Sequence, residues 1–254
     1  MKKALNITFT LILLALISGN GFSQIANIER SRMQTDTTGW AGSAGAAVSL
    51  TRNTVQVFAG NIEAQLQYKS KRSLYLILGS YGLLKASDSR LIDNGFLHLR
   101  YNYKINKVLR WELFTQWQNN KVTYIRYRVL AGTGPRFKML SSQKLSLYAA
   151  SLVMYEQEKE IIAGGLLHKD YRSSSYFSFT YSPASSVELV STTFFQPLLK
   201  DFKDYRILNQ AVLRLKTGKR LAVKINWDYL FDSRPAAGIP SENYTLSTGI
   251  DYDL

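Results

Sequence analysis

Two histidines are the side chains of this sequence with the greatest capacity for chemistry. His168 lies in the stretch "EQEKEIIAGGLLHKD", which also contains four carboxylates: Glu156, Glu158, Glu160 and Asp170. Carboxylates together with an imidazole can hold a divalent cation. Lysines alternate with these acids, however, which favours a solvated hairpin tip. We therefore expect no metal and no cofactor here.

His98 and His168 are the only histidines of the chain, and histidine is the side chain that most readily acts as a base near neutral pH. A lipid hydrolase acting at the rim of a membrane barrel would place a serine beside one of them. The sequence has no GxSxG motif, and no other pattern positions such a serine. We expect no enzymatic activity, with an outer-membrane lipid hydrolase as the alternative.

The segment around His98, "FLHLRYNYKI" at residues 96–105, alternates strictly between two kinds of side chain. Leu97, Leu99 and Tyr101 share one face, and His98 and Arg100 share the other. A β-strand directs successive side chains to opposite faces, so one face of this strand contacts an apolar medium and the other a polar one.

The same alternation recurs along the chain in segments of about ten residues or more, the length that a tilted membrane-crossing strand requires (about 9–11 residues). The segments predict an all-β fold: a single closed antiparallel transmembrane β-barrel of twelve strands. An even number places both termini on the side of the short turns, which is periplasmic in such barrels. A soluble exported β-sandwich is the rival architecture. The predicted strands are 38–50, 55–68, 73–86, 95–105, 108–118, 123–138, 144–156, 171–182, 187–197, 205–216, 220–231 and 244–254.

The N-terminus predicts export. Lys2 and Lys3 precede the apolar run 7–17 and a small-residue cleavage site, so residues 1–23 read as a signal peptide. Residues 24–37 form a polar periplasmic extension, and residues 38–254 form the barrel. The formal net charge is +14, or +12 without Lys2 and Lys3. A basic protein can bind nucleic acid or anionic lipid, and export makes nucleic acid the less suitable partner. We expect location in the outer membrane of a Gram-negative envelope.

Alternation directs a mostly basic set of side chains into the barrel. A ring of Arg and Lys favours anions, so one reading is a narrow lumen that passes small anions and loses that preference when Arg126 and Arg128 become Glu. The other reading is a filled interior in which these side chains pair with one another. The predicted lumen-facing residues are His98, Arg100, Lys104, Arg110, Glu112, Arg126, Arg128, Arg214, Lys224 and Asp228.

The short turns carry basic residues and no acid, whereas the proposed outer loops are mixed. This pattern predicts a basic collar that contacts anionic lipid headgroups at the inner leaflet. Its main members are Lys69, Lys71, Arg72, Lys107, Lys144, Lys219 and Arg220.

The last strand, ending "STGIDYDL", contains the polar Ser247 and Gly249 and then places Tyr252 and Leu254 on one face. It is similar to the terminal signal by which the assembly machinery recognises outer-membrane barrels. We expect outer-membrane lipids and that machinery as partners, and the oligomeric state stays open.

Residues 100–137, "RYNYKINKVLRWELFTQWQNNKVTYIRYRVLAGTGPRF", resemble a known family. The motifs are "RYNY", the hairpin into "WELFTQWQNN", and Arg126 and Arg128 before "GTGPRF". The family is the exported barrel family known as domain of unknown function 481, which includes salt-stress-induced outer-membrane proteins. The resemblance implies an outer-membrane barrel and assigns no catalytic residue. We thus expect a non-enzymatic envelope protein, either structural and stress-related or a narrow anion-preferring channel. A barrel that binds lipid or a small hydrophobic molecule is a further alternative.

Overall fold

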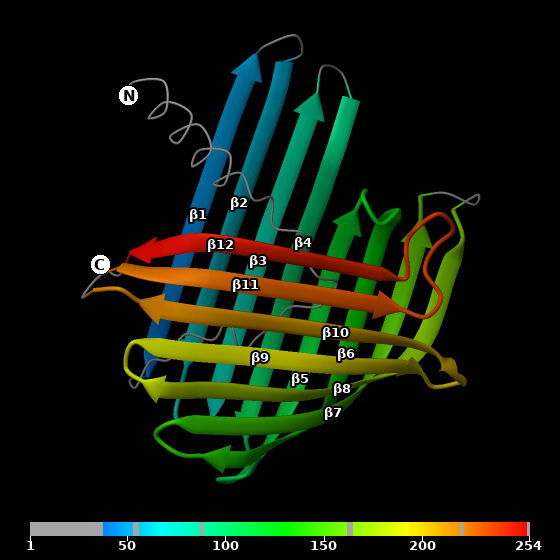
Figure 1. Cartoon of the computed structure of the whole chain (residues 1–254). Coiled ribbons are helices and arrows are strands. Elements are labelled where there is room, and N and C mark those ends of the chain that lie inside the picture. Colours follow the sequence, from blue (N-terminus) through cyan, green and yellow to red (C-terminus); the bar gives the residue numbers. More distant parts are fainter. Residues whose placement is uncertain (1–37, 53–55, 87–88, 162–164, 219–220, 253–254) are drawn as a thin grey trace, which may run out of the picture.

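The computed structural model describes residues 38–52, 56–86, 89–161, 165–218 and 221–252, so the predicted signal peptide and the 24–37 extension lie outside the described residues. The described residues form twelve antiparallel strands, each hydrogen-bonded to the next along the chain in one sheet (Figure 1). The predicted all-β class and strand number are confirmed. Among the described residues, no helix is long and apolar enough to cross a bilayer. The strands are β1 Gly39–Arg52, β2 Gln56–Lys69, β3 Ser73–Ala86, β4 Ser89–Lys104, β5 Leu109–Asn120, β6 Ile125–Ser141, β7 Leu145–Glu160, β8 Leu167–Ala184, β9 Val187–Leu198, β10 Asp201–Lys216, β11 Leu221–Asp232 and β12 Glu242–Tyr252.

Several strands are longer than the sequence predicts. β7 continues to Glu160 and β8 begins at Leu167, so most of the predicted loop 157–170 is sheet. β10 begins at Asp201, which leaves residues 199–200 between it and β9. The predicted long loops at 157–170 and 198–204 are therefore wrong, because polar side chains continue the alternation of the strands there. The long connection that the structure describes is 233–241, between β11 and β12.

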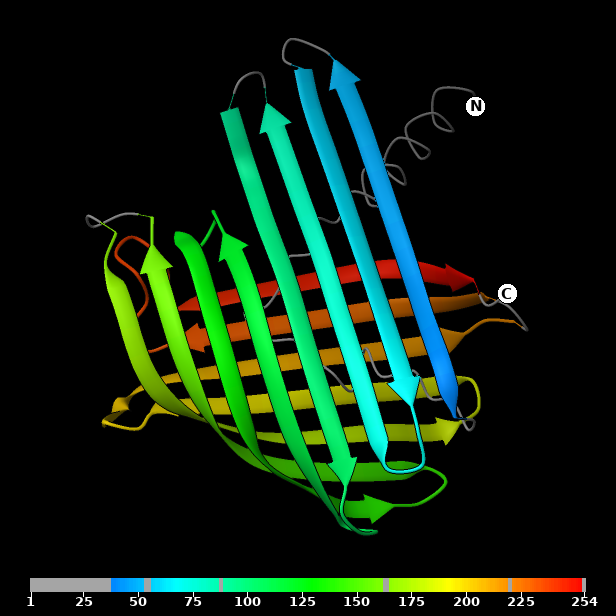
Figure 2. The same ribbon diagram turned by 180° about the vertical axis from the view of Figure 1, so that it is seen from behind.

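The sheet curves so that its two halves face each other. In Figure 1, β8–β12 cross in front of the steep strands β1–β5, and Figure 2 shows the same two walls from behind. A buried apolar cluster fills part of the space between the walls. Its members are Phe114, Leu130, Ala150, Leu152, Met154, Tyr176, Phe194, Leu208 and Leu230.

The predicted closure of the barrel is not found in this structure. Among the described residues, β1 and β12 are the two edges of the sheet, with no ladder between them. The first strand, "GWAGSAGAAVSLTR", offers few large side chains for packing: its central residues are Gly, Ala and Ser, and nearly all of them are exposed. Small side chains bury little area, so they do not fix the register of an edge strand strongly.

Because the number of consecutive antiparallel strands is even, Gly39 and Tyr252 lie at the same end of the strands as the short connections 70–72, 105–108, 142–144 and 185–186. We call this end of the strands the turn end. The opposite end, with the connections 121–124, 199–200 and 233–241, is called the loop end.

Candidate functional site: the charged interior

Alternation sorts the side chains of β4 and β5 into an inner and an outer face. His98, Arg100 and Glu112 are buried, whereas Leu97 and Leu113 are exposed. Directly paired residues of neighbouring strands lie on the same side of a sheet, so the inner face can be followed through the register into every strand.

The predicted lumen-facing residues fall into three groups. His98, Arg100, Glu112 and Arg128 are buried on the inner face. Lys104 is exposed near the turn end, and four others are half-buried: Arg110, Arg214, Lys224 and Asp228.

Arg126 does not share the inner face. β6 pairs with β7 through Ile125 and then Tyr127, so Arg126 is the extra residue of a β-bulge. A bulge shifts the alternation by one residue, and Arg126 is accordingly exposed while Arg128 is buried. The predicted inward direction of Arg126 is corrected for this reason.

Glu112 is the centre of a first buried group, which we call the central cluster. Arg100 Nη1 lies 2.8 Å from Glu112 Oε2, and Arg136 Nη1 lies 3.6 Å from Glu112 Oε1. The hydroxyl of Tyr176 donates to Glu112 Oε2 at 2.7 Å. Tyr176 is on β8 and Glu112 on β5, so this bond joins strands that are not neighbours in the sheet.

His98 belongs to a hydrogen-bonded chain beside the central cluster. Arg100 Nε donates to His98 Nε2 at 3.3 Å, which leaves His98 Nδ1 to donate to Gln116 Oε1 at 3.0 Å. The ring stacks against Phe96 and Phe114, with centroids 6.2 and 5.7 Å away. Both ring nitrogens of His98 are therefore engaged inside the protein, and its two faces are covered by aromatic rings.

Glu156 is the centre of a second buried group near the loop end, which we call the loop cluster. Arg206 Nη1 donates to both carboxylate oxygens of Glu156, at 2.8 and 2.9 Å. Arg172 Nε and Arg128 Nε lie 3.6 and 3.8 Å from the same carboxylate. Three arginines from β6, β8 and β10 thus converge on one glutamate of β7.

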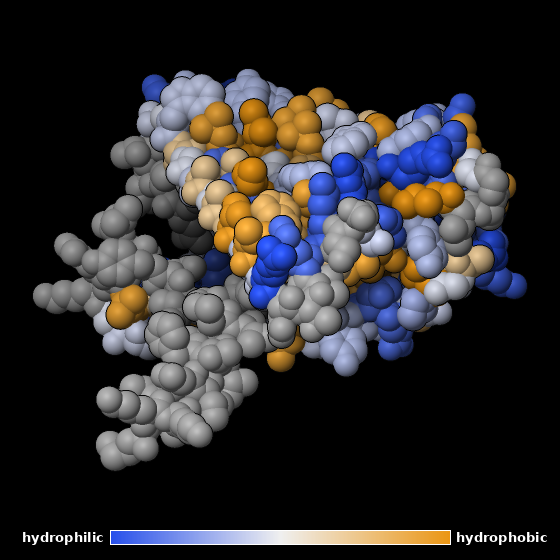
Figure 3. Space-filling model, turned by 90° about the horizontal axis from the view of Figure 1, so that it is seen from above, coloured by the Kyte–Doolittle hydropathy of each residue, from blue (hydrophilic) through white to orange (hydrophobic). Residues whose placement is uncertain are grey.

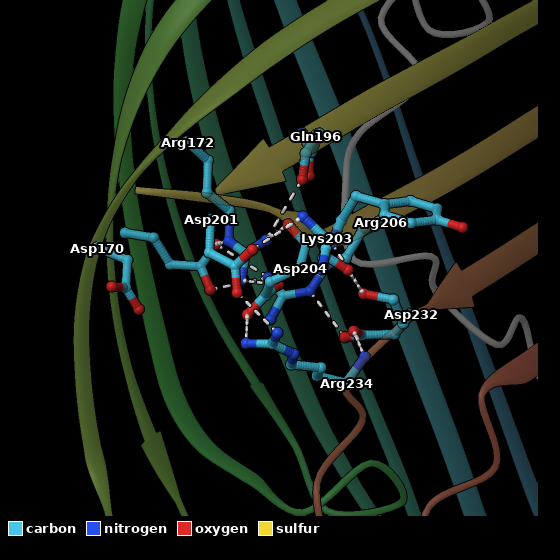
Figure 4. Close-up of polar contacts among 12 residues, drawn as sticks. Asp170, Arg172, Gln196, Asp201, Lys203, Asp204, Arg206, Asp232 and Arg234 are labelled. Carbon is cyan, nitrogen blue, oxygen red and sulfur yellow. Dashed lines mark hydrogen bonds and ion pairs between the residues drawn. The ribbon is translucent and has the colours of Figure 1, made fainter. Parts of the chain in front are cut away.

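The arginines of the loop cluster have further acidic partners. Arg206 Nε donates to Asp232 at 2.8 Å, and Arg172 Nη2 lies 2.8 Å from Asp204 (Figure 4). Arg128 contacts Glu158 through Nε and Nη2. Charges removed from water are tolerated when they are paired in this way.

A cavity of about 340 Å³ lies over the loop cluster at the loop end. Arg128, Arg172 and Arg206 are among the residues that line it, and the 233–241 connection contributes Pro235 and Ile239. The interior is thus occupied by ion pairs below this cavity.

The buried charges balance. Among the described residues they are Arg100, Arg128, Arg136, Arg172 and Arg206 against Glu112, Glu156, Glu158, Glu160 and Asp232. The sequence pattern was expected to give an excess of basic groups. The difference arises because β7 extends through the acidic run, which directs Glu156, Glu158 and Glu160 inward.

The carboxylates proposed as metal ligands have other partners. Glu156 and Glu158 pair with arginines, and His168 Nε2 lies 3.0 Å from Glu160 Oε1. Within the described ranges, no three His, Asp or Glu side chains are grouped so that they could hold a metal ion.

Sequence reasoning did not single out Arg136, Arg172 and Arg206 as site residues. A usable signal was present for the acids, because Met154, Glu156, Glu158 and Glu160 continue the inner-face alternation of β7. The arginines lie at inward positions of predicted strands, but their acidic partners, Glu112 for Arg136 and Glu156 for Arg172 and Arg206, are on other strands.

The outer face carries a row of aromatic rings near the turn end. Trp40, Tyr68, Tyr75 and Tyr101 are neighbours on β1–β4, with successive centroid distances of 4.8, 6.2 and 4.9 Å. At the loop end, Tyr205 lies 5.7 and 5.6 Å from Phe195 and Phe231.

Apolar side chains occupy the outer face between these aromatic groups. Leu66, Ile77 and Leu99 are neighbours in the register and are 41%, 43% and 39% exposed. The space-filling view from above shows hydrophobic residues gathered in broad patches (Figure 3). Soluble proteins rarely expose contiguous apolar surface on this scale.

The residues of the predicted basic collar that the structure describes lie together at the turn end. Lys71, Arg72, Lys107 and Lys144 are exposed there and Lys69 is half-buried, whereas Lys219 and Arg220 lie outside the described residues. Of the predicted terminal signal, Gly249 and Tyr252 belong to β12, and Leu254 lies outside the described residues.

The described residues form an all-β fold of twelve antiparallel strands in one sheet, and this fold is similar to that of solved outer-membrane β-barrels. The chain belongs to the family described as "Protein of unknown function, DUF481", whose model matches residues 43–254. The resemblance seen over residues 100–137 is confirmed, and the match extends to the end of the chain. No curated protein sequence matches.

Solved structures with a similar fold include the NanC porin, with 12% identity and a TM-score of 0.52, covering 84% of this chain and 99% of that one. The translocator domain of the autotransporter NalP from Neisseria meningitidis has 12% identity and a TM-score of 0.47, with 87% and 90% covered. At this identity the likeness to the porin shows the fold alone.

Proposed function

We propose that this chain is a non-enzymatic β-barrel of the outer membrane, closed by pairing of β1 with β12, whose interior is a narrow hydrophilic passage restricted by the two ion-pair clusters. The observation that carries the proposal is the distribution of polarity, which is the reverse of that in a soluble protein. Large apolar side chains are exposed on the outer face, and ten charged side chains are buried on the inner face. A lipid environment accounts for this distribution, because it contacts apolar side chains and leaves the polar ones inside.

Closure follows from the same environment. An unpaired strand edge in hydrocarbon leaves backbone N–H and C=O groups without partners, at a cost of several kcal/mol for each group. Pairing of β1 with β12 removes both edges. The turn end then faces the periplasm, and its lysines and arginines lie next to anionic phospholipid headgroups.

The passage is narrow because the clusters connect strands across the interior. Arg206 on β10 reaches Glu156 on β7, and Tyr176 on β8 reaches Glu112 on β5. A structural role in the envelope and slow passage of small solutes are both compatible with such an interior. The absence of a basic excess among the buried charges removes the ground for a strong anion preference.

The proposal is tested by refolding the mature chain in detergent and inserting it into liposomes. We expect sheet-rich circular dichroism, gel migration that changes on heating, protection of the strands from protease, and a small conductance in planar bilayers. Recovery of the chain as a water-soluble monomer without detergent would overturn the barrel. A folded barrel without conductance would leave the structural role.

The alternative of a lipid hydrolase is tested on the same sample. Both ring nitrogens of His98 are engaged inside the protein, which supports an inactive interior. Phospholipid turnover that disappears in His98→Asn or His168→Asn, both correctly folded, would replace our proposal by the hydrolase.

A further inference from the structure

The inner face differs sharply between the two sides of the sheet. On β4–β11 it carries the apolar cluster and both ion-pair clusters. On β1, by contrast, it carries small residues, because Ala41 pairs with the buried Gln67 and the alternation then places Ser43, Gly45, Ala47 and Ser49 on that side. The inner face of β2 continues this surface with Asn61, Glu63, Gln65 and Gln67.

β12 presents the same kind of inner face from the other edge. Asn226 on β11 is buried and donates to Ser247 on β12 at 3.2 Å. Register and alternation place Asn243, Thr245 and Gly249 on the same side as Ser247. The inner faces of β12, β1 and β2 therefore carry short, mostly uncharged polar side chains.

An asparagine that borders this surface has a buried polar atom without a partner in the described structure. Asn226 lacks a partner for Oδ1, although the residue is more than nine-tenths buried. Buried polar groups are almost always hydrogen-bonded, to protein or to water. Groups of this kind require a hydrated neighbourhood, which a passage for hydrophilic molecules supplies.

Side-chain size agrees with hydration on this side. A barrel of about eight strands is filled by its own side chains, and a larger one needs large side chains to be filled. Arginine, phenylalanine and leucine fill the β4–β11 side. Serine, alanine and glycine on β1 cannot fill the space opposite them.

Glu63 is the acidic residue of this surface on β1 and β2, and Lys69 is a basic residue at its turn end. It is exposed, and its side chain lies 3.6 Å from the position that a Cβ on Gly45 would occupy. The described residues provide no ion pair for it, in contrast to the buried acids, most of which contact arginine. An acidic group that lines a pore favours cations.

We propose that small hydrophilic solutes pass along the inner faces of β12, β1 and β2, and that Glu63 makes this passage prefer cations over anions. The inference rests on the proposed closed barrel, and it assigns the passage to one side of the interior.

Because the chain contains no cysteine, single-cysteine variants labelled with a charged, membrane-impermeant thiol reagent in liposomes give a direct test. Ser43→Cys lies on the proposed passage, and Ala44→Cys is its neighbour on the outer face. Ser178→Cys replaces an inner-face serine on the packed side, which is 0% exposed. We expect the reagent to label Ser43→Cys and not to label Ala44→Cys or Ser178→Cys. Ser49→Cys and its outer-face neighbour Val48→Cys form a second pair if a variant does not fold.

The outcomes separate the two proposals. If neither Ser43→Cys nor Ser178→Cys is labelled, the interior is filled, and the passage is overturned while the barrel stands. If Ser178→Cys is labelled as well as Ser43→Cys, water is not restricted to one side, which also overturns the inference. If Ala44→Cys is labelled together with Ser43→Cys, β1 does not face lipid, and the proposed barrel itself is overturned.

The role of Glu63 is measured as ion selectivity in planar bilayers under a salt gradient. Glu63→Gln should lower the cation-to-anion permeability ratio to about one, and Glu63→Lys should bring it below one. Glu242→Gln, an exposed acid at the start of β12 near the loop end, is the matched control and should keep the wild-type ratio. A wild-type channel that prefers anions, or a ratio that Glu63→Lys leaves unchanged, would overturn the assignment.

Discussion

Arg206 and Glu156 form a two-pronged ion pair although β10 and β7, which carry them, are separated in the sheet by β8 and β9. Arg206 Nη1 lies 2.8 and 2.9 Å from the two oxygens of Glu156, and both side chains are buried. The pair therefore connects two parts of the curved sheet that have no backbone hydrogen bonds in common. Curvature of the sheet and pairing of these charges depend on each other.

Removal of Glu156 should destabilise the protein strongly. Glu156→Gln leaves three buried arginines around a neutral side chain, and removing one partner of a buried ion pair typically costs about 3–5 kcal/mol. The measurement is the temperature at which the folded, fast-migrating band is lost in detergent. The exposed Glu242→Gln should behave like wild type, and equal stability of the two variants would contradict the role of the loop cluster.

Loss of the Tyr176 hydroxyl should weaken the central cluster by less. A hydrogen bond to a charged group contributes about 1.5–3 kcal/mol, so Tyr176→Phe should lower the free energy of unfolding in urea by that amount. Tyr181→Phe removes a hydroxyl from an exposed side chain five residues further along β8 and should have almost no effect. If the two variants unfold at the same urea concentration, the bond between Tyr176 and Glu112 does not hold β8 against β5.

The β-bulge predicts opposite behaviour for two arginines that are two residues apart. Arg128→Ala should lower the free energy of unfolding by about 3–5 kcal/mol, because it leaves the buried Glu158 without its arginine. Arg126→Ala, at an exposed position, should change the free energy of unfolding by about 0.5 kcal/mol or less. Urea unfolding of the two variants provides the comparison. A large loss for Arg126→Ala would place its side chain inside the barrel and remove the bulge from our account.

Much of the fold could be predicted from the sequence because alternation is a local property. Segments such as 96–105 determine which residues share a face without knowledge of their partners, and turns separate one segment from the next. The number of strands, their order and the burial of His98, Arg100 and Glu112 all depend on this local pattern.

What could not be predicted depends on curvature and on irregular pairing. The approach of Arg206 to Glu156 requires the sheet to fold back on itself, which periodicity does not specify. The bulge at Arg126 is a single residue that leaves no mark in the composition. The acids of 156–160 were predicted to be in a loop because a run of charged residues usually indicates a segment exposed to water. The alternation of the strand nevertheless continues through them.

The lysines and arginines of the turn end should favour anionic membranes. Replacing Lys71, Arg72, Lys107 and Lys144 by Ser should weaken association of the folded protein with anionic over zwitterionic liposomes. Each charge contributes about 1 kcal/mol near such a surface. The difference should be larger at low salt, because salt screens exposed charges.

The matched control removes the same number of charges from the opposite end of the strands: Lys85, Lys121, Lys169 and Lys203. It should alter association with anionic liposomes less than the turn-end variant does. Equal effects of the two variants would mean that net charge, and not the position of the collar, determines the association.

The most direct measurement is a spin-label scan of β4 in liposomes. Residues 96–103 are replaced one at a time by cysteine, which the chain otherwise lacks, and the collision of each label with oxygen and with a water-soluble nickel complex is recorded. Our account predicts strong collision with oxygen at Leu97, Leu99 and Tyr103, on the exposed apolar face, and little collision with either agent at the buried His98 and Arg100. Strong collision with the nickel complex at Leu97 and Leu99 would show that this face is in water, which would contradict the transmembrane barrel.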